Sequence, residues 1–144
     1  MKYAIILLFL FQTPAAHDNL RGGIALGGYD PVSYFTGQEP EKGDKSITAQ
    51  HAGAVYQFAN EDNRSQFLGN PQQYVPAYGG WCAYAMGVSG DKVKVDPETF
   101  KIIDNRLYLF YNFWGNNTLK SWNEDENVLK ADADKYWSGI VATK

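Results

Sequence analysis

A single cysteine, Cys82, is the feature that most limits how this 144-residue chain can fold. One thiol cannot form a disulfide within the chain, so no covalent framework can replace a hydrophobic core. A chain of this length corresponds to one domain and is long enough to bury such a core. Aromatic side chains make up 15% of the residues and charged ones 20%, which favours a compact globule with an aromatic core over a disordered tail.

Residues 1–16, MKYAIILLFLFQTPAA, have the pattern of a secretory signal peptide. Lys2 precedes an apolar run from Ala4 to Phe11, and small residues follow it. The run is too short to span a bilayer, and an uncleaved anchor is the alternative interpretation. Cleavage after Ala15 or Ala16 predicts a periplasmic or secreted protein that keeps no membrane segment once the signal is removed.

The charge of the chain argues against a nucleic-acid partner. Without Lys2 there are 12 basic and 16 acidic residues, which gives a net charge of −4. The sequence contains no basic stripe with interleaved aromatic residues, and a phosphate backbone would repel an acidic chain.

Glycine-rich residues follow the signal, and they predict a flexible leader over 17–27 that docks at most through Ile24 and Leu26. The folded domain is expected to occupy residues 28–140. Its first element is predicted to be a short extended piece from Val32 to Phe35.

Two β-hairpins are the clearest secondary-structure signals in the domain. Each consists of two β-rich stretches around a two-residue turn, and an asparagine such as Asn105 tolerates the left-handed backbone that a tight turn needs. The hairpins pair 47–51 with 55–58 around Ala52-Gly53, and 100–103 with 107–111 around Asp104-Asn105.

Helix signals lie between and after the hairpins. Asn60 is predicted to cap a helix over 61–68, whose Phe67 and Leu68 would face inward. Apolar residues at near-helical spacing from 117 to 137 predict a C-terminal helix. The sequence therefore predicts an α+β domain, with a small, mostly antiparallel sheet built from two hairpins and packed with two or three helices.

Three stretches together resemble the YHS domain family, and within it the exported single-domain bacterial members. They are YDPVSYFTG, then GAVYQFANEDNRSQFLGNPQQYVPAYGGWCAYAM, then NRLYLFYN followed by a tryptophan-bearing helix. The resemblance covers about residues 28–137. It implies a fold more than an activity, because the metal-binding role discussed for this family belongs to a cysteine-bearing branch.

The resemblance also implies that the metal site of that branch is absent here. Where the branch has cysteines, this chain has Ser33 after Asp-Pro-Val, and Ala59 and Asn63 after Tyr-Gln-Phe. Soft metals need thiolate or imidazole donors, which a hydroxyl, a methyl group and an amide do not replace.

Cys82 itself allows three interpretations. It can be a buried packing residue, the role we favour, because it stands among several aromatic residues. It can bind copper or zinc with Met86, four residues away, or with His51, since thiolate, thioether and imidazole groups are soft donors. It can be a redox or nucleophilic thiol, although the sequence places no histidine, lysine or arginine within nine residues to lower its pKa.

The paired glycines Gly79 and Gly80 let a ligand or another stretch of backbone approach where a β-carbon would collide. The aromatic rings around them suit either a small pocket or a solid core. We therefore expect a non-enzymatic exported domain with no required cofactor, which binds a small molecule or a protein partner. The alternatives are a copper- or zinc-binding protein and a thiol redox enzyme. The expected ligand-binding residues are Tyr78, Gly79, Gly80, Trp81, Cys82 and Tyr84, and the expected metal ligands are Cys82, Met86 and His51.

Overall fold

A computed structural model describes residues 16–143, so the predicted signal peptide lies almost entirely outside the described residues. Within that range, no helix is both long and apolar enough to cross a membrane. The chain runs through β1 (Leu20–Arg21), β2 (Ile24–Ala25), η1 (Leu26–Gly28), η2 (Ser33–Phe35), β3 (Asp44–His51), β4 (Ala54–Phe58), α1 (Glu61–Gly69), α2 (Pro71–Tyr74), η3 (Ala77–Gly80), α3 (Ala83–Ser89), β5 (Asp96–Ile103), β6 (Arg106–Phe110), β7 (Asn112–Phe113), β8 (Asn116–Asn117), α4 (Thr118–Glu124) and α5 (Glu126–Val141).

The predicted α+β class is confirmed, and both predicted hairpins form. A four-stranded sheet has the order β1-β2-β4-β3, in which only β2 and β4 are parallel. The second hairpin, β5–β6, does not join this sheet, so the expectation of one sheet built from both hairpins is wrong. Outside the hairpin, its strands make one isolated backbone bridge within the described residues, between Leu109 and Cys82.

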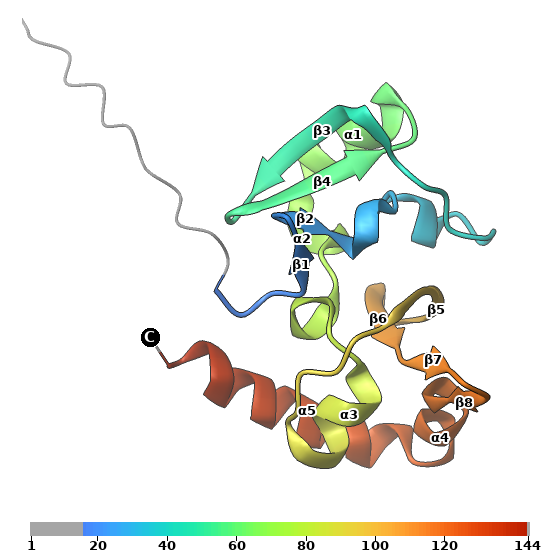
Figure 1. The fold of residues 1–144 in the computed structure, drawn as a ribbon, viewed down its shortest axis with the longest axis vertical. Helices are drawn as coiled ribbons and strands as arrows, with labels where there is room; N and C mark the ends of the chain where they lie inside the picture. Colours follow the sequence, from blue (N-terminus) through green and yellow to red (C-terminus); the bar gives the residue numbers. More distant parts are fainter. Residues whose placement is uncertain (1–15, 144) are drawn as a thin grey trace, which may run out of the picture.

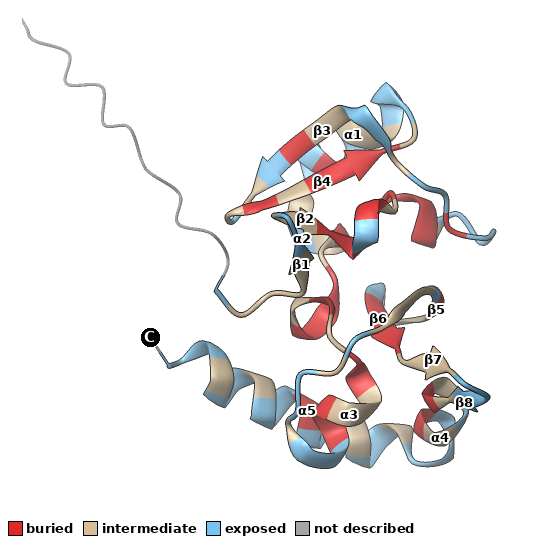
Figure 2. Ribbon diagram, viewed as in Figure 1, coloured by how far each residue is buried: buried red, intermediate tan, exposed pale blue. Residues whose placement is uncertain are grey.

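Strand β6 explains why the second hairpin stays separate. Successive side chains of a strand point to opposite faces, and both faces of β6 are covered by core. Leu107 and Leu109 belong to a cluster with the four-stranded sheet, α1 and α2, which we call the sheet lobe. Tyr108 and Phe110 belong to a cluster with α3, α4 and α5, which we call the helical lobe. Figure 1 shows β6 between the two lobes, and Figure 2 shows it buried.

Residues 17–27 are not a flexible leader, because they form the edge of the sheet lobe. Gly22 and Gly23 have positive φ angles of 57° and 81°, which turn the chain tightly between β1 and β2. Ile24 then pairs with Val55 in β4, and Leu26 is buried beneath the sheet. The glycines that suggested flexibility are therefore the turn of an ordered hairpin.

The segment after Pro31 is also different from the prediction. Ser33–Phe35 form a 3-10 turn instead of an extended piece. The Asp30 carboxylate accepts a hydrogen bond from the Val32 amide at 2.8 Å, and the Asp30 carbonyl accepts one from the Ser33 amide at 3.2 Å. Such local side-chain bonds from aspartate stabilise a turn in place of a strand.

Helix α1 begins as predicted, since the Asn60 side chain accepts from the Asn63 amide. Phe67 is fully buried, but Leu68 is 48% exposed, because consecutive residues of a helix point about 100° apart and cannot both face one core. The predicted C-terminal helix is broken at Asp125 into α4 and α5. The buried Trp122 indole of α4 donates to Glu126 at the start of α5, at 3.0 Å.

Candidate functional site

The expected binding segment, Tyr78 to Met86, begins in a sharply turned backbone. Tyr78, Gly79 and Gly80 all have left-handed φ angles, of 55°, 60° and 84°. Such angles are costly for tyrosine, and the Tyr78 hydroxyl is fixed by donating to Asp134 of α5 at 2.8 Å. Burial, with this hydrogen bond in second place, raises the pKa of Tyr78 well above its ordinary value.

The close approach that the glycine pair permits is made by the chain's own N-terminal segment. The Asn19 amide donates to the Gly79 carbonyl at 2.8 Å, and the Asn19 side chain donates to the Gly80 carbonyl at 3.1 Å. The Trp81 indole donates to the His17 carbonyl at 2.7 Å. A β-carbon on Gly79 would lie 2.7 Å from an Asp18 carboxylate oxygen and 2.8 Å from the Trp137 ring. Much of the expected ligand surface is therefore covered by residues 17–19.

Cys82 lies in a packed and hydrogen-bonded setting. It is fully buried, and its sulfur accepts from the Tyr111 amide at 3.3 Å and lies 3.5 Å from the Thr118 hydroxyl. A shallow groove of about 300 Å³ runs past it, with Tyr84 on its wall. This arrangement agrees with the packing role that the sequence favoured for Cys82.

The three expected metal ligands are not brought together. Met86 is fully buried in the helical lobe, whereas His51 ends β3 and packs edge-to-face on Phe67 in the sheet lobe. Cys82 and His51 line different cavities. Among residues 16–143, no three histidine, cysteine, aspartate or glutamate side chains gather in a way that could hold a metal ion.

The positions that the resemblance matches to cysteines do meet in space, around the buried Asp30. One Asp30 oxygen accepts from the Ala59 amide at 2.9 Å and from the Asn63 side chain at 2.7 Å. The Ser33 hydroxyl donates to the Asp30 carbonyl at 2.7 Å. Every group here is already hydrogen-bonded, so these residues fasten the turn after Pro31 to the end of β4 and the start of α1.

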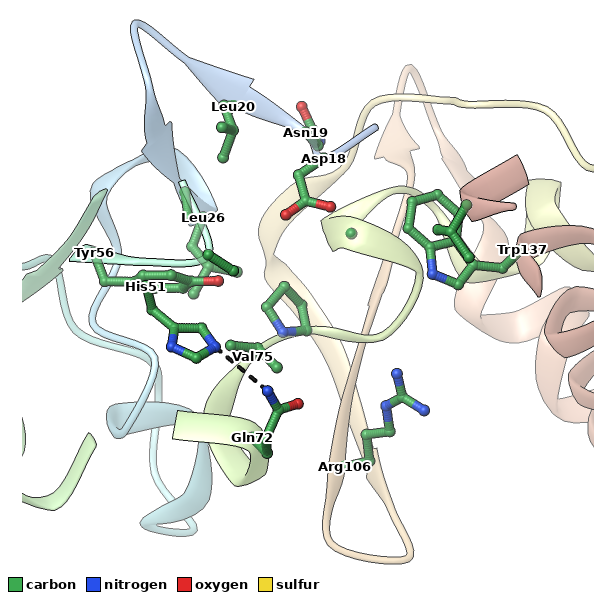
Figure 3. Close-up of a pocket in the computed structure, with 15 residues that line it drawn as sticks. Asp18, Asn19, Leu20, Leu26, His51, Tyr56, Gln72, Val75, Arg106 and Trp137 are labelled. Atoms are coloured by element: carbon green, nitrogen blue, oxygen red, sulfur yellow. Dashed lines mark hydrogen bonds between the residues drawn. The ribbon is translucent and has the colours of Figure 1, made fainter. Parts of the chain in front are cut away.

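A pocket of about 260 Å³ lies between the two lobes, and we call it the interlobe pocket. Of the residues singled out from the sequence, Gly79 and His51 line it. Figure 3 shows the other polar groups, which come from separate elements. They are Asp18 beside β1, Tyr56 of β4, Gln72 of α2 and Arg106 of β6, and Trp137 of α5 adds an aromatic wall.

Neither of the two charged groups that line the interlobe pocket, Asp18 and Arg106, forms an ion pair within the described residues. Burial raises the pKa of the Asp18 carboxyl, while the positive charges of His17 and Lys92 act in the opposite direction. Arg106 is exposed, and among the described residues the two ion pairs are Arg64–Glu61 and Lys101–Glu126, so neither Asp18 nor Arg106 is paired.

The other polar groups of the pocket described above come from the sheet lobe. The His51 ring lies 3.4 Å from the Gln72 side-chain nitrogen, and burial raises the pKa of Tyr56, so its hydroxyl stays neutral. Sequence reasoning missed Asp18, Arg106 and Trp137, because they stand far apart in the chain and share no motif. Only the fold brings them to one wall.

Comparison of the chain with protein-family models, with curated proteins and with solved structures finds no match. The functional argument therefore depends on the geometry of the chain itself.

Proposed function

We propose that this protein is an exported, YHS-like domain that binds a small organic molecule in the interlobe pocket and catalyses no reaction. Export is supported by the signal-like pattern of residues 1–16, and the family by the three stretches quoted above. The observation that carries the binding proposal is the pocket, which combines apolar walls with unpaired polar groups at the junction of two cores. Small-molecule sites have this composition and tend to lie at such junctions.

The position of the pocket adds to this argument. Its walls come from the N-terminal segment, β3, β4, α2, β6 and α5, so its shape is fixed by both lobes. A ligand there would contact both cores and would stabilise the folded chain by mass action. A ligand at one hundred times its dissociation constant adds about 2.7 kcal/mol, which is a rise of several degrees in Tm for a domain of this size.

A thermal-shift screen of the purified chain against small organic molecules tests the proposal. Val141 lies at the wall of the pocket and is 49% exposed, so Val141→Trp can fill the pocket with little strain on the core. Val128→Trp is the matched control, because Val128 is on the same helix, is 54% exposed and does not line the pocket. We expect compounds that stabilise the natural chain and the Val128→Trp variant but not the Val141→Trp variant. A screen without hits, or hits unaffected by Val141→Trp, would refute the proposal.

Metal binding through Cys82 is the alternative function, and the hydrogen bonds to its sulfur give it less support. A metal ion would have to displace the Tyr111 amide from the sulfur and find further donors in the apolar helical lobe. Metal analysis of the purified chain after copper or zinc loading tests this alternative, with Cys82→Ser as the control. Stoichiometric metal that is lost in the variant would establish it in place of our proposal.

A further inference from the structure

The charges of the interlobe pocket indicate what kind of molecule it can take, an inference that rests on the proposed function. Its lining includes one carboxylate, Asp18, and one guanidinium, Arg106, and no other aspartate, glutamate, lysine or arginine. Figure 3 shows the two charged groups well apart, since Asp18 comes from the N-terminal segment and Arg106 from the start of β6. The two ion pairs of the described residues include neither of them.

The wall between the charged groups is largely apolar. Val75, Pro76 and Leu26 line the pocket on the side of the sheet lobe, and Trp137 lines it on the side of α5. Such a surface favours hydrocarbon over water. The volume of about 260 Å³ corresponds to about nine water molecules at roughly 30 Å³ each, so it suits a molecule of about ten non-hydrogen atoms.

A ligand with one charge fits this wall poorly. An anion at Arg106 would share the pocket with the Asp18 carboxylate, and a cation at Asp18 would share it with the Arg106 guanidinium. A ligand with a single charge would therefore always meet a like charge, which repels it. Burial raises the pKa of the Asp18 carboxyl, and an ammonium group beside it would favour its charged form.

We infer that the interlobe pocket binds a small organic zwitterion, with its ammonium group at Asp18, its carboxylate at Arg106 and an apolar spacer against Val75 and Trp137. Both ends then form charge-assisted hydrogen bonds, and an arginine can hold a carboxylate through two parallel N–H donors. The hydrogen-bonded His51 and Gln72 side chains add further polar contacts.

The inference is tested by titration calorimetry of the purified chain with linear ω-amino acids from glycine to 6-aminohexanoate. This series varies the distance between the ammonium and carboxylate groups. The length of the member that binds most tightly therefore indicates the spacing between Asp18 and Arg106. Hexylamine and hexanoate are the single-charge controls, since each lacks one end of 6-aminohexanoate. We expect the best zwitterion to bind at least about tenfold more tightly than either control.

Two variants, each of which removes one charge from the pocket, then test which end of the ligand each residue binds. In Asp18→Asn, the advantage of the zwitterion over hexanoate should disappear, while its advantage over hexylamine remains. In Arg106→Gln, the reverse should hold. Asp132→Asn and Lys135→Gln are matched controls, because both residues are exposed on α5 and line no part of the pocket, and they should change neither preference.

Three outcomes would overturn the inference without refuting the proposed function. One is a single-charge control that binds the natural chain as tightly as any zwitterion. Another is an equal loss of all ligands in both variants. The third is binding of uncharged screening hits, sensitive to Val141→Trp, together with no binding of the ω-amino acids. The proposed function itself fails only if no compound binds in a way that depends on the pocket.

Discussion

Replacing Asp30 by asparagine tests the clearest structural role in the sheet lobe. Asp30 is fully buried, and its carboxylate accepts hydrogen bonds from three N–H groups. One oxygen accepts from the Val32 amide, and the other accepts from the Ala59 amide and the Asn63 side chain. An asparagine has the same shape but offers only one accepting oxygen.

Either orientation of the new amide leaves a donor facing a donor. In the better one, the oxygen of the asparagine keeps the Ala59 and Asn63 bonds, and its NH₂ group faces the Val32 amide. The lost acceptor leaves a buried N–H unsatisfied, which costs about 1–3 kcal/mol. The two remaining bonds lose the assistance of the charge, at about 1 kcal/mol each. The free energy of unfolding should therefore fall by about 3–5 kcal/mol, a large part of the roughly 5–15 kcal/mol of a typical domain.

Urea unfolding followed by tryptophan fluorescence measures this change. With a slope of about 1.5–2 kcal/mol per molar urea, the midpoint of Asp30→Asn should fall by about 2 M. Asn63→Ala removes one donor instead of the acceptor, so its midpoint should fall less. Asp132→Asn is the control for the same chemical change at an exposed site, and should stay within about 0.5 kcal/mol of the natural chain. An Asp30→Asn midpoint equal to that of Asp132→Asn would refute the reasoning.

Three further predictions concern the helical lobe. Gly87→Ala should lower the free energy of unfolding by about 1–3 kcal/mol, because its new β-carbon would lie 2.6 Å from a backbone oxygen of α5. Gly139→Ala, in open space on α5, should instead raise the free energy of unfolding by about 0.5–1 kcal/mol. Equal Tm values for the two variants would contradict this. The buried Cys82 thiol should react with a thiol probe only as fast as the chain unfolds, and rapid labelling of the native protein would instead favour the thiol-enzyme alternative. The Lys101 hydrogen bond holds the pKa of Glu126 below its ordinary value of 4.5, so Glu126 stabilises the fold above that value and loses this contribution as pH falls through its folded pKa. Glu126→Gln should therefore be less stable than the natural chain, by up to about 1 kcal/mol at pH 7, and the gap should close as the pH falls below the ordinary value of 4.5. A gap independent of pH in urea unfolding would contradict this.

Local signals accounted for the parts of the fold that the sequence predicted. Each hairpin turn contains a residue that accepts left-handed backbone, Gly53 with a φ of 82° and Asn105 with a φ of 61°. Helix α1 begins at Asn60 because its side chain caps the first turn. Such features depend on residues within four positions of each other, which a sequence displays directly.

Long-range partners decided the parts that were mispredicted. The turn after Pro31 depends on Asp30, whose carboxylate is held by Ala59 and Asn63, about thirty residues further along. Glu126, which begins α5 after the break at Asp125, accepts from Lys101 of β5, 25 residues away. No periodicity in the sequence announces such contacts, because they depend on how finished elements pack together.

The glycine pair shows which part of the candidate site could be predicted from the sequence. Gly79 does mark a place where another group comes closer than a β-carbon allows, and that group is Asp18 of the chain's own N-terminal segment. The same contact brings the Asp18 carboxylate to the wall of the interlobe pocket, which Arg106 of β6 and Trp137 of α5 also line. A stretch that composition alone assigns to a flexible leader thus supplies an edge of the sheet, the partner of the glycine pair and the negative end of the proposed ligand site. Fold and site depend here on one segment, so a change that detaches residues 17–21 would alter both.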